Sequence, residues 1–176
     1  LGAETELVWL GDKTIHGCKG CYGCVQARRC VIEDDFQPIL AQMARADGIL
    51  LGAPTYHASI PCELKALLDR AGFSGRWACN EMKKADEGYT WQGSLFSGKV
   101  VAPVTVARRA GQNFAFAQLL LWAACNDCVI PGNTYWNVGV AGKGGAVDAD
   151  GDSEGVGIMQ GMARRMVRTI EALNRT

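Results

Sequence analysis

Four cysteines in one short stretch carry the clearest chemistry in this sequence. They fall within residues 17–31 with the spacing C-x2-C-x2-C-x5-C, and interspersed glycines allow the backbone of such a segment to turn sharply. Iron-sulfur clusters are held by thiolates at short spacings, because one turn can wrap three corners of a cluster while a fourth thiolate closes the cage. The spacing predicts a 4Fe-4S cluster with the ligands Cys18, Cys21, Cys24 and Cys30.

Two other interpretations of this cysteine run stay open. Zinc also binds four thiolates, but its four-cysteine sites usually join two knuckles across a longer spacer, whereas here all four thiols fall in one loop. Alternatively, the cysteines are reduced thiols that hold no metal. A second C-x2-C pair, Cys125 and Cys128, is interpreted as core thiols, because the first would end a helix and the second would begin a strand.

Length and composition bound the kind of protein. The chain has 176 residues, of which 48% are hydrophobic and 20% charged, enough for one domain with a buried core. Its net charge is zero and its charge runs are short, so neither nucleic acid nor an anionic membrane is favoured as a partner. Eight cysteines without a secretory leader favour the reducing cytoplasm as the location.

Short apolar segments alternate with helical patterns along the chain. Continuous or alternating apolar residues predict buried strands at residues 4–10, 49–51, 100–106 and 128–130. Apolar residues at helical spacing predict helices at residues 36–43, 64–68, 114–124 and 159–173. Alternation of this kind is typical of an open, doubly wound α/β fold with a parallel sheet.

The loops that follow the predicted strands are expected to form the site. Ligands of open parallel sheets bind beyond the carboxyl ends of the strands, so residues 52–61, 107–112 and 132–155 are expected at one edge. The cysteine loop follows predicted strand 4–10, and we expect it at the same edge. Residues 71–98 have many glycines and aromatic residues but no sustained period, which is typical of a functional insertion or lid.

Several segments together resemble one family. With its cysteine run and residues 46–56, 64–70, 107–112 and 132–137, the chain resembles the iron-sulfur flavoproteins within the NAD(P)H-dependent FMN reductase group of flavodoxin-like proteins. The resemblance implies a parallel sheet of strand order 2-1-3-4-5 with FMN at its carboxyl edge. The family's first strand, phosphate loop and first helix have no counterpart here. We therefore expect a single FMN-binding domain over residues 1–176 that is N-terminally incomplete, and the contacts to the FMN phosphate stay unassigned.

The resemblance also implies where the flavin ring lies. It would rest on the Pro54–Tyr56 loop, with the Tyr56 ring stacked beside it. His57 is a candidate donor to the flavin, although a loop histidine is more often only solvated. A cation beyond the next strand would stabilise the anionic reduced flavin, but the arginines there could equally be solvated. The predicted cofactor-binding residues are Pro54, Thr55, Tyr56, His57, Ser59, Arg108, Arg109 and Gly111.

These assignments predict a flavin-dependent oxidoreductase that couples the two-electron chemistry of FMN to one-electron exchange at a 4Fe-4S cluster. NAD(P)H or a ferredoxin would donate electrons, and a small molecule or a protein would accept them. One rival is an FMN-dependent flavin or quinone reductase that holds no cluster. A second rival is a non-catalytic electron carrier or a zinc-binding module.

The aromatic residues of the predicted lid point to assembly. Trp77, Tyr89, Trp91 and Phe96 lie among glycines, and such aromatic content is typical of a subunit interface. We expect a homodimer or homotetramer in which this arm covers the flavin site of a neighbour. In that arrangement the cluster of one chain would face the FMN of another.

Overall fold

Three parallel strands form the sheet, in the order β1-β2-β3. The computed structural model describes residues 1–82, 87–88, 90–142, 147–148 and 151–175. The strands are β1 (Gly48–Pro54), β2 (Val100–Ala107) and β3 (Val138–Val140). β1 pairs with β2 along its whole length, while β3 pairs only with the carboxyl end of β2, where Thr105 lies opposite Val138. The parallel sheet predicted from the sequence is confirmed.

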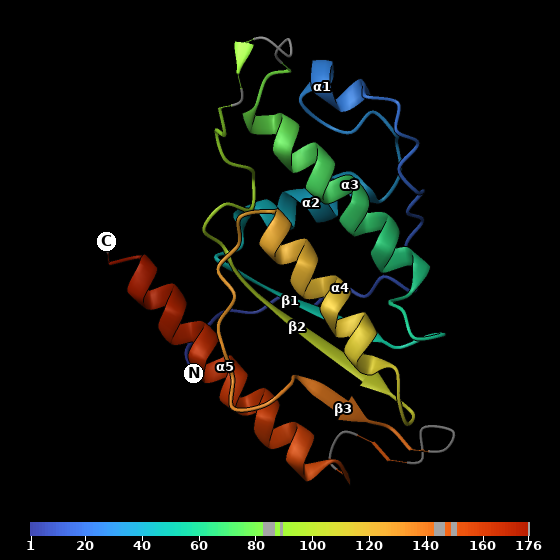
Figure 1. Ribbon diagram of the computed structural model, residues 1–176, viewed down its shortest axis with the longest axis vertical. Helices are drawn as coiled ribbons and strands as arrows, with labels where there is room; N and C mark the ends of the chain where they lie inside the picture. The colour runs from blue at the N-terminus through green and yellow to red at the C-terminus, as the bar shows by residue number, and fades with distance from the viewer. Residues whose placement is uncertain (83–86, 89, 143–146, 149–150, 176) are drawn as a thin grey trace.

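Helices lie on both faces of the sheet (Figure 1). Helices α2 (Phe36–Arg45), α3 (Cys62–Cys79) and α4 (Gln112–Cys125) pack on one face, and α5 (Ser153–Leu173) packs on the other. A short helix, α1 (Gly23–Ala27), lies within the cysteine loop. Among the described residues, no helix is long and apolar enough to cross a membrane.

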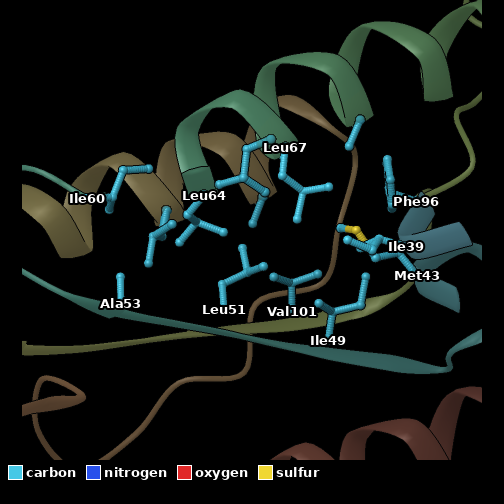
Figure 2. Close-up of a cluster of buried hydrophobic side chains, with 14 of the residues drawn as sticks. Ile39, Met43, Ile49, Leu51, Ala53, Ile60, Leu64, Leu67, Phe96 and Val101 are labelled. Carbon is cyan, nitrogen blue, oxygen red and sulfur yellow. The ribbon is translucent and has the colours of Figure 1, made fainter. Parts of the chain in front are cut away.

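Alternation along the strands sends apolar side chains to the two faces. Figure 2 shows Leu64 and Leu67 of α3 above Leu51 and Val101 of the sheet, within the larger of the two apolar clusters. On the opposite face, Val100 and Ala102 of β2 pack against Met162 and Met166 of α5. This α/β layering follows from the period of two in strands and of about 3.6 in helices.

Local sequence explains where two of the helices begin. Asp34 accepts a hydrogen bond from the amide of Phe36 at 3.1 Å, at the start of α2. Asp152 caps α5 by accepting from the amide of Gly155 at 3.0 Å, and it also accepts from the amide of Val140 at 2.9 Å. These two hydrogen bonds lower the pKa of Asp152, because both stabilise its charged form. The same carboxylate therefore ties β3 to the first turn of α5.

The predicted strand at residues 4–10 is wrong. This segment has no strand assignment, and its Leu7 and Trp9 side chains are 92% and 66% exposed, while Val8 and Leu10 pack against the larger core cluster. Alternation alone does not make a strand, because a strand also needs a neighbour for its backbone hydrogen bonds. Near residue 129 the structure has only an isolated bridge between Val100 and Val129.

The interpretation of residues 71–98 as an irregular insertion or lid is wrong for residues 71–79. Helix α3 continues through Cys79. Phe96 is fully buried, with its ring centroid 5.1 Å from that of Trp122. The Trp91 indole donates to Asp127 of the same chain at 3.4 Å. Tyr89 lies outside the described residues. The aromatic residues that the structure describes thus make contacts within their own chain, and a role of this segment at a subunit interface stays a prediction.

Candidate cofactor sites

The loop after β1 makes a tight hairpin at the carboxyl edge of the sheet. Tyr56 and Ser59 exchange two backbone hydrogen bonds of 2.9 and 3.0 Å across His57 and Ala58, whose φ angles are 48° and 60°. A left-handed backbone at non-glycine residues costs roughly 1–2 kcal/mol each. Neighbours offset this cost: the Gln118 side chain of α4 accepts from the hydroxyl of Ser59 at 3.2 Å. No pattern in the sequence identifies Gln118 as a residue of this site, because its contact with Ser59 depends only on how α4 packs.

The loop after β2 meets this hairpin at Gly111. The φ angle of Gly111 is 92°, and a Cβ added there would lie 3.3 Å from the Cα of Ala58 and 3.7 Å from the Cγ2 of Thr55. A side chain at this position would therefore press against the hairpin. The structure confirms that the loops after β1 and β2 come together at one edge, as the sequence predicts.

One polar atom at this edge has no partner within the described residues. The Thr55 hydroxyl is buried and makes no hydrogen bond, although the Thr55 amide donates to the carbonyl of Val106 at 2.7 Å. A buried hydroxyl without a partner costs about 1–3 kcal/mol, so it favours a bound group that supplies the missing partner. This atom is the local feature that fits a flavin at the predicted site.

Most of the other residues predicted to bind the flavin have side chains that are exposed to solvent. Pro54, His57, Arg108 and Arg109 are exposed, and the Tyr56 side chain is 62% exposed. A flat cofactor would bury such a surface. The predicted third loop of this edge, residues 132–155, is described only in part, because residues 143–146 and 149–150 lie outside the described residues.

The four cysteines of the loop line one pocket between α1 and the middle of α3. Both residues that flank α1, Tyr22 and Arg28, have φ angles of 56°, so a left-handed residue stands at each end of this short helix. The Tyr22 ring meets Phe73 of α3 edge-on, with 5.7 Å between centroids. The pocket is lined by Cys18, Cys21, Cys24 and Cys30 together with Val31, Ile32, Arg70, Phe73 and Ser74.

The thiols in this pocket influence one another. Burial raises the pKa of Cys24, a backbone hydrogen bond lowers it, and the nearby thiols of Cys30, Cys18 and Cys21 raise it further by charge repulsion. Four soft thiolate donors on one pocket suit iron-sulfur or zinc chemistry. Within the described residues, however, no group of three or more His, Cys, Asp or Glu side chains has a metal-binding arrangement. The cysteines converge without adopting ligand geometry.

A buried ion pair anchors the loop to α3. The Arg70 and Asp34 side chains are 1% and 2% exposed, and Nη1 of Arg70 lies 2.6 Å from Oδ2 of Asp34. Burial alone would raise the pKa of Asp34. Hydrogen bonds from Arg70 and from the amides of His16 and Phe36 outweigh burial and lower the pKa below its ordinary value. Arg70 also donates through Nε to Sγ of Cys30 at 3.3 Å.

The expectation that the cysteine loop shares the edge of the flavin loops is wrong. Figure 1 places α1 beside the carboxyl-terminal half of α3, whereas the hairpin lies where α3 begins, at Cys62. At about 1.5 Å per helical residue, the contact at Phe73 is about 16 Å along α3 from Cys62. Residues 4–10, which precede the loop, do not form the predicted strand that would have led it to the carboxyl edge.

The two cysteines of the second C-x2-C pair differ in burial. Cys125 is exposed at the end of α4, so its interpretation as a core thiol is wrong, whereas Cys128 packs against the larger core cluster. Burial, reinforced by the charge of Asp127, raises the pKa of Cys128 to about 12.

This raised pKa predicts that the Cys128 thiol reacts slowly with alkylating reagents. At pH 8 only about 1 in 10,000 Cys128 side chains would be thiolate, against roughly a quarter of an ordinary thiol with a pKa near 8.5. In folded protein under iodoacetamide, we expect Cys128 to react at least a hundredfold more slowly than exposed Cys62 and Cys125. Peptide mass spectrometry over time measures the rates, with urea-unfolded protein as the control. Equal rates in folded protein would contradict the burial of Cys128.

The fold and the carboxyl-edge loops define a flavodoxin-like α/β flavoprotein. Residues 1–143 match the model of the NADPH-dependent FMN reductase family, and the chain belongs to this family, as its sequence resemblance predicts. It is thus a flavin-dependent oxidoreductase by class.

Three archaeal iron-sulfur flavoproteins are similar to this chain, two of them over nearly its whole length. An iron-sulfur flavoprotein of Methanosarcina thermophila is 26% identical over 176 residues, which cover 99% of this chain and 82% of that protein. One from Archaeoglobus fulgidus is 28% identical and covers 98% and 83%. One from Methanocaldococcus jannaschii is 44% identical over 70 residues, only 40% of this chain and 36% of that protein.

Two solved structures share the fold. The crystal structure of RosB with a bound 8-demethyl-8-formylriboflavin-5'-phosphate intermediate has a TM-score of 0.69 at 19% identity, covering 98% of this chain and 67% of that one. FerB, an NAD(P)H:(acceptor) oxidoreductase of Paracoccus denitrificans, has a TM-score of 0.51 at 20% identity, covering 78% and 68%. The predicted flavodoxin-like fold class is confirmed, while the full strand order 2-1-3-4-5 stays a prediction.

Proposed function

We propose that this flavin-dependent oxidoreductase is an iron-sulfur flavoprotein, with FMN at the loops after β1 and β2 and a 4Fe-4S cluster on Cys18, Cys21, Cys24 and Cys30. The observation that carries the proposal is the convergence of these four thiols on one pocket. The iron-sulfur flavoproteins of Methanosarcina thermophila and Archaeoglobus fulgidus, which this chain matches over nearly its whole length, support it.

The residues of the carboxyl edge would bind and orient the flavin. The Thr55 hydroxyl, which lacks a partner within the described residues, would hydrogen-bond the ring, and the exposed Tyr56 ring would stack beside it. Gly111 would let the second loop approach closely, and the exposed Arg108 would hold positive charge near the pyrimidine end. His57, Ser59, Pro54 and Arg109 complete the proposed set.

The cysteine loop would hold the group that exchanges single electrons. When bound, FMN supplies hydride or one-electron chemistry and a 4Fe-4S cluster supplies one-electron chemistry. The chain keeps the two proposed sites apart along α3, so we propose a homodimer or homotetramer in which the cysteine loop of one subunit approaches the flavin loops of another. A nicotinamide cofactor is the proposed donor, in keeping with the family, and ferredoxin is the alternative.

Tyr56→Ala is expected to weaken FMN binding by roughly tenfold. Loss of a packed ring contact is worth about 1 kcal/mol beyond the buried area, and about 1.4 kcal/mol corresponds to tenfold. The comparison variant is His57→Ala in the same hairpin, which should weaken FMN binding much less, because it removes no ring stacked on the flavin. Flavin fluorescence on dilution of anaerobic protein measures the dissociation constant. Equal constants for wild type and Tyr56→Ala would place the ring elsewhere.

A visible spectrum separates this proposal from its nearest rival, a cluster-free FMN or quinone reductase. A cluster adds broad absorption that bleaches with dithionite and remains when the flavin is removed. Protein purified without air should show this absorption in addition to the flavin bands. Flavin bands alone, with NAD(P)H oxidation intact, would support the rival. Sedimentation at micromolar concentration tests the assembly, and a monomer that transfers electrons between both cofactors would contradict the shared arrangement.

A further inference from the structure

We propose that Arg70 raises the reduction potential of the cluster by acting through the thiolate of Cys30. This inference rests on the cluster assignment under the proposed function. It begins from one contact, the hydrogen bond from Nε of Arg70 to Sγ of Cys30 at 3.3 Å. Arg70 is therefore a positioning residue on α3 that reaches the proposed cluster only through one of its ligands.

The guanidinium group of Arg70 is held in place on every side. Nη1 donates to Asp34 at 2.6 Å and to the carbonyl of His16 at 3.1 Å, and Nη2 donates to the carbonyl of Ile32 at 3.0 Å. Its central carbon lies 4.1 Å from the centroid of the Phe36 ring. With a side chain only 1% exposed, the group is fixed, so its Nε–H stays directed at Cys30.

The direction of the effect follows from electrostatics. A hydrogen bond to a ligand sulfur draws electron density from the cluster and favours the reduced state, which carries one more negative charge. The nearby Asp34 carboxylate offsets much of the guanidinium charge, but the N–H dipole at Cys30 remains. Because the site is buried, this dipole is screened less than it would be in water.

The pocket is asymmetric in a way that suits this role. Cys18 and Cys21 are exposed, whereas Cys30 is partly buried and packs against the larger core cluster. Water can donate hydrogen bonds to the exposed sulfurs. At Cys30 the donor is supplied by the protein, so its strength is fixed by the fold.

Three variants test the proposal in anaerobic full-length protein. Arg70→Lys keeps a positive charge beside Asp34 but removes Nε. The double variant Asp34→Asn with Arg70→Gln removes both charges together, so no unpaired charge stays buried. It tests the proposal even if Arg70→Lys fails to fold. The matched control is Arg28→Gln. Arg28 also ties the cysteine loop to α3, through the carbonyl of Trp77 at 2.9 Å, but within the described residues it donates no hydrogen bond to a cysteine.

Redox titration followed by electron paramagnetic resonance gives the midpoint potential of the cluster. We expect both Arg70 variants to lower it, so that the ratio of reduced to oxidised cluster at a fixed potential falls about tenfold, which is about 59 mV for one electron. Arg28→Gln should leave the ratio unchanged. Iron and FMN contents confirm that each variant is loaded and folded.

The outcomes distinguish this inference from the assignment beneath it. An unchanged midpoint in loaded Arg70 variants would overturn the role of Arg70 and leave the cluster assignment intact. An equal drop in Arg28→Gln would also overturn it, because a general loosening of the loop would then explain the shift. Wild-type protein without iron and sulfide would overturn both the cluster assignment and this inference.

Discussion

Cys24→Ser is expected to abolish the iron-sulfur cluster while leaving FMN and the fold in place. Cys24 is the third of the four proposed ligands. It lies in α1, which is outside the sheet and has no buried residue. Serine is a poor ligand for iron-sulfur clusters, and three remaining thiolates cannot complete the terminal coordination of a cube. We expect iron to fall from about four per chain to below one, with the flavin content unchanged.

Cys128→Ser is the matched control, because Cys128 is also partly buried but lies apart from the cysteine pocket. Iron and acid-labile sulfide are measured in both variants after anaerobic purification. Full iron in Cys24→Ser would remove Cys24 from the ligand set. Loss of iron in both variants would show that the assay reports folding and not ligation.

Asp34→Ala is expected to lower the free energy of unfolding by about 3–5 kcal/mol. The substitution would leave the Arg70 charge buried without its partner, which costs far more than loss of an exposed pair. The control is Asp69→Ala, which breaks an ion pair between Lys65 and Asp69 whose side chains are 55% and 46% exposed. That change should cost no more than about 0.5 kcal/mol. Urea unfolding followed by circular dichroism measures both, and equal effects would contradict the buried pair.

The same carboxylate gives stability a defined dependence on pH. The pKa of Asp34 is lowered in the folded protein, so its contribution is fully present above the unfolded pKa of about 3.9. It is lost as the pH falls through the folded value. In Asp34→Asn this part of the acid dependence should disappear, while stability near pH 7 falls.

The sequence predicted the elements whose patterns are local. Helix α2 has buried residues at Phe36, Ile39, Leu40 and Met43, the helical spacing on which its prediction rests. Strands β1 and β2 were predicted from continuous apolar runs. Strand β2 is buried on both faces over most of its length, as such a run predicts, whereas β1 alternates between buried and exposed residues, with Leu50 54% exposed.

The missed elements depend on distant partners. The second half of α3 was interpreted as a lid because of Gly72 and Gly75, yet the helix needs a small residue there: a Cβ on Gly75 would lie 2.8 Å from the Phe96 ring. Strand β3 has three residues, too few to show a period. The strand at residues 4–10 was expected from alternation, which says nothing about whether a partner strand is present.

The candidate sites divide in the same way. Cysteine spacing and the loop after β1 are local motifs, so their residues could be named from the sequence. Arg70 was visible only as part of a family-like segment, because its contacts to His16, Cys30 and Asp34 span 36 to 54 positions of the chain. That the cysteine pocket lies along α3, away from the loops after β1 and β2, also depends on tertiary packing.

The metal, sulfide and flavin content of protein purified without air tests the central proposal most directly. Four thiolates on one pocket predict about four iron and four acid-labile sulfide per chain, together with about one FMN. The same sample, analysed for zinc, should contain well under one equivalent. Stoichiometric zinc without sulfide, or FMN with neither metal, would contradict the iron-sulfur flavoprotein account.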